Sequence, residues 1–529
     1  MKFLLTVIVT AIMGLLLSLN RQQPTTCETT LRLTDAKTGH ELAGLIRITD
    51  ENGKPVPLEG LLSRGTGLNK RLPISRWFVF PRKASLRLPR KKLTITAFSG
   101  LETEVSTVEI DLTEKTETTI TVPLKRFYNA SAKGFRSGNT HLHLQKISRE
   151  ECDRYLREIP KADGLDVLFV SYLERAVADK QYTSNQYRQK DLDKLGKVSG
   201  VTFGNGEEHR HNFTGFGQGY GHVMFLNIKK LILPVSIGPG IMKVGSDGLP
   251  LRRGIRTARK DGATVIWCHN NWGMEAVPNF LAGRVDAQNI FDGGVHGSYK
   301  DSFYRYLNAG LNVPFSTGTD WFMYDFSRVY CDMKTDLTVG NWLKTLAAGR
   351  NYITNGPLLE FQIDGKQLGE TVSLRKPGMV TVKARIIGRA NFQRLEIVQN
   401  GKVVGKANCR KVGGHYEAEF NADIPISTPS WFALRTPPPP VKDDPTLSKP
   451  VPQNLLGREL FAHSSAIHVA INGTRRFDKT IARQLLAEMK ANRKTIASRG
   501  KFTDATERAR VLDVYSDGIE ELQRRIESR

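Results

Sequence analysis

Cysteine is scarce in this chain. Its 529 residues include five cysteines, and no two of them form a C-x-x-C pair. This excludes a small scaffold held together by disulfide bonds and a zinc site built from paired cysteines. In an exported protein, an odd number also leaves at least one thiol unpaired within a monomer.

Long apolar runs are nearly absent, and the single one lies at the N-terminus. Met1-Lys2 is followed by an uncharged run from Phe3 to Leu19 and then by Asn20-Arg21. A short basic start with an apolar core is typical of an export signal. The run is close to the lower length limit of a spanning helix, so an uncleaved membrane anchor is the first alternative and a buried helix the second. We therefore expect an exported protein whose residues 1–26 are a signal peptide or an N-terminal anchor.

Acidic residues are outnumbered by basic ones. The chain has 77 Lys and Arg against 53 Asp and Glu, a net charge of +24. A field of this sign attracts phosphate, carboxylate or sulfate groups. The sequence has no zinc-finger spacing, no RNA-binding signature and no heptad-linked basic region. We therefore expect a small-molecule or anionic substrate and no nucleic-acid partner, and the sequence does not indicate the oligomeric state.

The spacing of apolar residues divides the chain into regions. Residues 27–130 contain short alternating runs typical of a β-sandwich, whereas residues 131–356 alternate strand-like and helix-like segments, as in an α/β barrel or a doubly wound sheet. Residues 357–472 return to short strands and predict a second β-sandwich. Residues 473–529 carry apolar residues at helical spacing and predict a helical tail with packing faces.

Histidine is concentrated in the central region, where the segment Gly138-Asn139-Thr140-His141-Leu142-His143 stands out. Residues i and i+2 of a strand point to the same side, so two imidazoles can bind one divalent ion. The alternative is a packed or solvated strand with no ligand role.

Four later segments place acids and histidines at or beside predicted strand ends. Buried carboxylates and imidazoles need a cation or hydrogen-bond partners, although an exposed polar loop or a hydrogen-bonded structural histidine would need no metal. The residues concerned are Glu207, Glu208, His209 and His211, then His222, then His269, and finally Asp320.

The order of these signals resembles that of the PHP-domain metallohydrolases, and more closely that of their CehA/McbA family. The order is H-x-H, G-x-E, G-H, a strand-ending His and G-x-D. The segment Leu346–Pro357 resembles that family's GR-x-Y-x-T-NGP stretch, and Phe461–Ser465 resembles its later AHTSP stretch. The resemblance covers residues 134–470. It implies an α/β fold, with a PHP-like distorted (β/α) barrel flanked by the two β-sandwiches and the helical tail.

The resemblance also implies a set of metal ligands. A first ion would be held by His141, His143, Glu208 and Asp320, and a second by His222 and His269 with Glu208 bridging. Mixed nitrogen and oxygen ligands suit Zn, Mn or Fe.

Three departures from the family pattern limit the number of ions. The family's TDH stretch is absent after the second strand, the stretch Asp320-Trp321-Phe322 lacks the final His, and no further His follows His143 closely. Each loss would remove a ligand of a third ion. We therefore expect one or two divalent ions.

The activity that follows is hydrolysis of an ester, amide, carbamate or phosphoester. Glu207, His209 and His211 are the predicted general acids or bases. Asn270, Asn271 and Trp272 are predicted to contact substrate, and Arg328 is a candidate anion contact whose alternative is a surface arginine. The missing TDH pair leaves open a catalytically degraded protein that binds glycan or anions without turnover.

Overall fold

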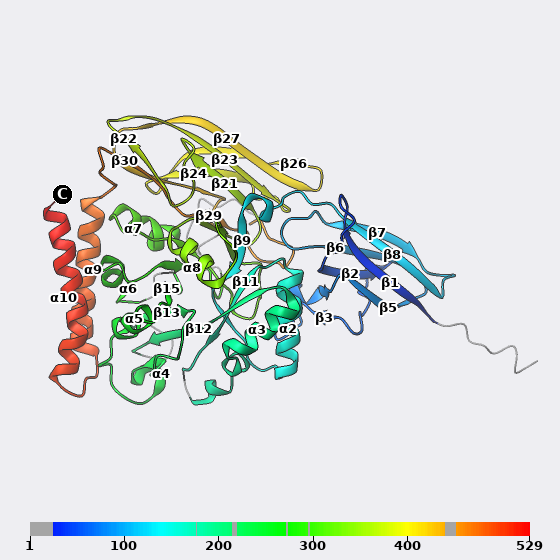
Figure 1. The fold of residues 1–529 in the computed structure, drawn as a ribbon, viewed down its shortest axis with the longest axis horizontal. Helices are drawn as coiled ribbons and strands as arrows, with labels where there is room; N and C mark the ends of the chain where they lie inside the picture. The colour runs from blue at the N-terminus through cyan, green and yellow to red at the C-terminus, as the bar shows by residue number, and fades with distance from the viewer. Residues whose placement is uncertain are drawn as a thin grey trace, which may run out of the picture.

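The computed structural model describes residues 25–175, 177–213, 219–270, 273–294, 297–439 and 451–528. Figure 1 shows a β-rich N-terminal region on the right, an α/β region in the centre, a layer of C-terminal strands above it and two helices on the left. Among the helices of the described residues, none is long and apolar enough to cross a membrane. The predicted signal segment lies almost wholly outside the described residues.

The N-terminal region consists of two sheets that enclose their own core. One has the strand order β5-β1-β8 and the other β3-β4-β2-β6-β7. Alternate residues of β1 are buried, as the period of a strand that faces a core on one side requires. The strands are β1 (Thr26–Asp35), β2 (Gly44–Asp50), β3 (Leu62–Ser63), β4 (Phe78–Phe80), β5 (Lys83–Pro89), β6 (Lys92–Phe98), β7 (Ser106–Asp111) and β8 (Glu117–Leu124).

A buried ion pair fixes this region to the centre of the molecule. Arg64 follows β3, and its Nε and Nη2 donate to the two carboxylate oxygens of Asp163 at 3.1 and 2.6 Å. Both side chains are fully buried. Such a bidentate pair holds its two partners in one orientation.

The central region is built on a curled mixed sheet. Its order is β17-β16-β15-β13-β12-β11-β9-β19-β20, with β14 beside β12. The pairs within β9-β11-β12 and β15-β16-β17 are parallel, whereas β13 is antiparallel to both of its neighbours. The strands are β9 (Phe135–Asn139), β11 (Val167–Tyr172), β12 (Thr202–His211), β13 (Gly221–Leu226), β14 (Ser236–Ile237), β15 (Thr264–Trp267), β16 (Ala287–Asn289), β17 (Phe315–Ser316), β19 (Arg328–Asp332) and β20 (Asn351–Thr354).

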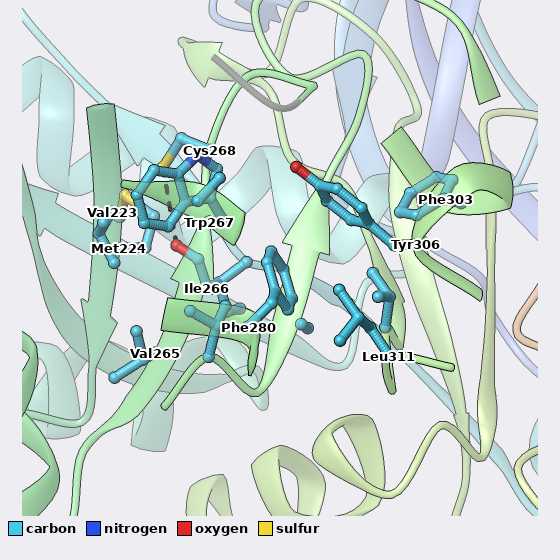
Figure 2. Close-up of a cluster of buried hydrophobic side chains, with 14 of the residues drawn as sticks. Val223, Met224, Val265, Ile266, Trp267, Cys268, Phe280, Phe303, Tyr306 and Leu311 are labelled. Carbon is cyan, nitrogen blue, oxygen red and sulfur yellow. Dashed lines mark hydrogen bonds between the residues drawn. The ribbon is translucent and has the colours of Figure 1, made fainter. Parts of the chain in front are cut away.

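Helices cover this sheet and bury an apolar core beneath the site. In Figure 2, Ile266 and Trp267 of β15 lie close to Phe280 of α6, with Tyr306 of α7 nearby. The helices are α2 (Arg149–Ala162), α3 (Gln189–Ser199), α4 (Pro239–Met242), α5 (Leu251–Lys260), α6 (Ala276–Leu281), α7 (Arg305–Asn308) and α8 (Val339–Ala347). The predicted mixed α/β character is confirmed.

The large sheet continues past the boundary predicted between residues 356 and 357. Strand β20 pairs with β29, and the order then runs β29-β28-β24-β25, with β30 and β22 attached. A separate four-stranded sheet has the order β21-β23-β27-β26. The strands are β21 (Leu358–Ile363), β22 (Thr371–Leu374), β23 (Gly378–Gly388), β24 (Arg394–Gln399), β25 (Lys402–Asn408), β26 (Arg410–Val412), β27 (His415–Ile426), β28 (Ser430–Arg435), β29 (Ala462–Ser464) and β30 (Ile467–Ile471).

In the described part of the sheet, β17 is joined to β20 by side-chain hydrogen bonds and not by backbone strand pairing. The hydroxyl of Ser465 accepts from the backbone N–H of Phe315 at 3.0 Å and donates to Asn351 Oδ1 at 2.7 Å. The amide of Asn351 in turn donates to the carbonyl of Phe315. Asn351 and Ser465 belong to the two segments that carried the later part of the family resemblance, so these segments brace the curled sheet.

Two C-terminal helices close the fold, as predicted for the tail. They are α9 (Lys479–Arg499) and α10 (Ala505–Glu527), which lie side by side at the edge of the central region (Figure 1). Leu485, Met489, Val511 and Leu522 are fully buried in the core that the two helices share with the strands of the curled sheet. The predicted apolar stripes are therefore packing faces.

Candidate metal centre

The predicted ligands converge at one edge of the curled sheet, where its strands end. His141 and His143 share one segment and the other ligands come from separate parts of the chain. The short sheet of β10 (Leu142–His143) and β18 (Asp320–Trp321) aligns His143 with Asp320. His141 precedes β10 and His143 lies in it, Glu208 lies in β12, His222 in β13, His269 after β15, and Asp320 in β18.

The first group is formed by His141, His143, Glu208 and Asp320, whose ligand atoms all lie within 4.8 Å of one another. His141 Nε2 is 3.1 Å from His143 Nε2 and 3.4 Å from Asp320 Oδ1, and His143 Nε2 is 3.2 Å from Glu208 Oε2. Adjacent ligands bound at about 2.1 Å from one ion are about 3.0 to 3.4 Å apart. The group therefore fits a single divalent ion.

Hydrogen bonds fix the imidazoles of this group in the tautomer that a metal needs. His141 Nδ1 donates to Asp292 Oδ2 at 2.8 Å, and His143 Nδ1 donates to the carbonyl of Ser171 at 3.0 Å. When both rings are neutral, each Nε2 carries a lone pair, and the two lone pairs face each other across 3.1 Å. This arrangement is repulsive unless a cation or a proton lies between them.

The second group is formed by Glu208, His222 and His269. Glu208 Oε1 lies 3.2 Å from His222 Nδ1 and 3.5 Å from His269 Nε2, whereas Glu208 Oε2 faces the first group. The carboxylate is buried, and its Oε1 has no hydrogen-bond partner of good geometry. An orphaned buried oxygen of this kind needs a positive charge nearby, from an ion or from a side chain.

Asp292 is a member of the site that the sequence analysis missed. It follows β16, and its Oδ2 contacts His141 Nδ1 at 2.8 Å and His269 Nδ1 at 3.4 Å. A carboxylate behind a ligating histidine orients the ring and raises its basicity. Only its place just after a strand could have marked it, and β16 is three residues long and mostly polar, so the sequence does not predict it.

Arg210 is the second residue that the sequence analysis missed. It lies two residues after Glu208 on β12, so both side chains point to the same face of the strand. It is 5% exposed, and its Nη2 is 3.2 Å from His222 Nε2. A guanidinium therefore lies within the cluster.

Opposite charges set the ionisation of the cluster. Burial favours the neutral form of His141, but the carboxylates of Asp320, Asp292 and Glu208 outweigh it and raise its pKa to about 9. Burial would raise the pKa of Glu208, but Arg210 and the surrounding histidines hold it well below the usual value. The Glu208 carboxylate is thus ionised and available to a cation.

Uncommon backbone geometry supports the arrangement. His269, Asn270 and Asp320 have positive φ angles of 53°, 55° and 56°, a region that residues other than glycine rarely adopt. Gly318 lies against His141, and a Cβ at position 318 would be 2.5 Å from the Cβ of His141. The G-x-D stretch therefore needs glycine to bring Asp320 close to the histidine pair.

The structure does not bring the predicted acid–base residues to the cluster. Glu207, His209 and His211 alternate with Glu208 along β12, so they occupy the opposite face of the strand. His209 Nδ1 is 2.9 Å from Glu207 Oε1, and His211 Nε2 is 2.7 Å from Asp247 Oδ1. These buried pairs are packed beneath the sheet, which corrects the acid–base roles that we expected for them.

The predicted substrate contacts have mixed outcomes. Arg328 is 1% exposed and donates to the carbonyls of Phe326 and Asp163 at 2.9 and 2.8 Å, so it is a structural residue and neither an anion contact nor a surface arginine. Asn270 lies beside His269, and its Oδ1 is buried without a partner. Asn271 and Trp272 lie outside the described residues.

Trp321 marks the open side of the cluster. The side chains of Asp320 and His269 are 15% and 10% exposed, whereas those of His141 and His143 are fully buried. Trp321 follows Asp320, and the centroid of its ring is 5.3 Å from that of His143. Solvent therefore reaches the cluster from the side of Asp320 and His269.

No family model and no curated protein matches the chain. Two solved structures of the β-glucuronidase of Parabacteroides merdae match it at 11% and 10% identity, with TM-scores of 0.18 and 0.17. These matches cover 82% and 85% of this chain and 60% and 65% of the other, so the chain spans less than two thirds of the proteins it matches. At such scores the likeness carries no argument about fold or function.

Proposed function

We propose that the cluster binds divalent metal and that the protein is an exported metal-dependent hydrolase of the PHP type, within the CehA/McbA family. The observation that carries the proposal is the pair of His141 and His143 Nε2 atoms, 3.1 Å apart with both Nδ1 atoms already donating. Zn, Mn or Fe suits the mixed nitrogen and oxygen ligands.

The residues of the chain then have distinct tasks. His141, His143, Glu208 and Asp320 hold the ion, and Asp292 orients His141. A divalent ion in such a site supplies Lewis-acid activation of water and of the substrate oxygen. Trp321 offers an aromatic face to an apolar or sugar group, and the net charge of +24 favours an anionic substrate.

A second candidate is a protein that binds a glycan or an anion without turnover. It is favoured by the position of Glu207, His209 and His211, because their burial on the far face of β12 removes the predicted proton-transfer groups from the site. The remaining titratable side chains that the described residues bring to the cluster are ligands or their direct partners.

The test combines metal content with turnover. Metal would be measured by mass spectrometry on the purified protein, on His141→Ala and on the control His211→Ala, which removes a buried histidine from the other face. We expect metal in the parent and the control and its loss in His141→Ala. Turnover would be assayed on aryl phosphodiesters, esters, amides and carbamates.

The outcomes separate the candidates. Metal together with turnover of one substrate class supports the hydrolase. Metal without turnover on the whole panel supports the binding protein. A parent protein that takes up no Zn, Mn or Fe overturns the metal site and the hydrolase.

A further inference from the structure

We propose that Arg210 supplies the second positive charge of this centre, so that it holds one divalent ion, in the group of His141, His143, Glu208 and Asp320, and not two. This inference rests on the proposed metal-binding function. It concerns the number of ions, which the family resemblance left at one or two, and their location.

The position of Arg210 is the first argument. Its Nη1 lies 3.5 Å from both oxygens of Glu208, and its Nη2 lies 3.2 Å from His222 Nε2. Two of the three residues that would bind a second ion are therefore already in contact with a guanidinium. Because arginine is never deprotonated in proteins, this charge is permanent.

The tautomer of His222 is the second argument. When Arg210 Nη2 donates to Nε2, the ring proton lies on Nδ1, which faces Glu208 Oε1 at 3.2 Å. That tautomer has no lone pair directed at an ion beside Glu208. The other tautomer donates from Nε2 to Asn212 Oδ1 at 3.0 Å, and it requires Arg210 to leave His222. A second ion and the Arg210 contact therefore exclude each other.

The balance of charge is the third argument. The described residues bring three carboxylates to the cluster, Glu208, Asp292 and Asp320, together with the charge of Arg210. One divalent ion makes the sum zero when the histidines are neutral, whereas two ions leave a buried excess of two positive charges. Uncompensated buried charge is strongly unfavourable.

Metal stoichiometry tests the inference directly. The full chain would be equilibrated with excess Zn²⁺, desalted and analysed for zinc per chain, in parallel with Arg210→Met and Arg253→Met. The control is matched, because Arg253 Nη2 lies 3.4 Å from His209 Nε2 and so presents a guanidinium to a histidine on the other face of β12. We expect one equivalent in the parent and in Arg253→Met, and two in Arg210→Met.

The location of the ion is tested with two histidine variants. His222→Ala should keep the one equivalent, whereas His141→Ala should lose it. Loss of zinc from His222→Ala, with zinc retained in His141→Ala, would place the ion in the second group and overturn the inference.

The remaining outcomes are distinguishable. The role of Arg210 is overturned if the parent binds two equivalents of zinc or if a folded Arg210→Met binds one. Either result leaves the proposed function standing. If the parent binds no zinc, the proposed function itself is overturned. If Arg210→Met does not fold, electron paramagnetic resonance of the Mn²⁺-loaded parent decides. The signal of an isolated Mn²⁺ supports the inference, and that of a coupled pair overturns it.

Discussion

Asp292→Asn probes the residue on which the geometry of the histidines depends. The substitution keeps the shape of the side chain and removes its charge. Asp292 Oδ2 accepts the Nδ1 proton of His141 at 2.8 Å, and an amide oxygen can still accept it, but more weakly. The amide NH₂ can also face His141 and force the wrong tautomer, because it is a donor.

The expected loss follows from these contacts. Hydrogen-bond partners of metal-binding histidines contribute about 10- to 100-fold to metal affinity. In free energy this is about 1.4 to 2.8 kcal/mol. Asp292 also lies 3.4 Å from His269 Nδ1 and accepts from Asn289 at 3.1 Å, so it holds more than one element of the site. We therefore expect the larger end of the range.

Competition against a fluorescent zinc chelator measures the affinity, and thermal unfolding of the metal-free protein shows whether the fold is intact. Asp247→Asn is the matched control, because Asp247 makes the same type of buried contact, 2.7 Å from His211 Nε2, away from the cluster. It should lower stability and leave zinc affinity unchanged. Equal affinity in a folded Asp292→Asn, or an equal loss in Asp247→Asn, would refute the reasoning.

Three further predictions concern one residue beside the site and two buried residues away from it. Gly318→Ala should abolish or greatly weaken metal binding, because the new Cβ would be 2.5 Å from the Cβ of His141. The zinc content of the purified variant tests this prediction, and full zinc occupancy would contradict it. His209→Ala should reduce the free energy of unfolding by about 2 kcal/mol, because buried Glu207 Oε1 loses its donor while Oε2 keeps the N–H of Ile232. Urea unfolding measures this change. Zinc content should stay the same, and metal loss would restore a role for His209 in the site. Burial raises the pKa of Glu275 from 4.5 to about 7. Between these two pH values the folded state keeps a proton that the unfolded state has lost. The unfolding free energy should therefore fall as pH rises from about 4.5 to 7. That contribution is at most about 3 kcal/mol, and unfolding curves across this interval should show a shallower decline in Glu275→Gln.

The sequence alone identified the residues of the candidate metal cluster other than Asp292 and Arg210. Strand periodicity placed His141 and His143 on one side of the chain, and apolar segments placed Glu208, His269 and Asp320 at strands or strand ends. These inferences are local, because the period of a strand and the burial of apolar residues do not depend on distant parts of the chain. The β-rich N-terminal region and the helical tail followed from the same periodicities.

Only the tertiary structure decided which face of each strand meets the others. The alternation along β12 separates Glu208 and Arg210 from Glu207, His209 and His211, but the sequence does not tell which set faces the histidine pair. Asp292 enters the site after a strand of only three residues, and Arg210 is a cation, a residue type that no search for metal ligands selects. Their roles arise from contacts between segments far apart in the chain, which packing of the curled sheet brings together and which no local pattern encodes.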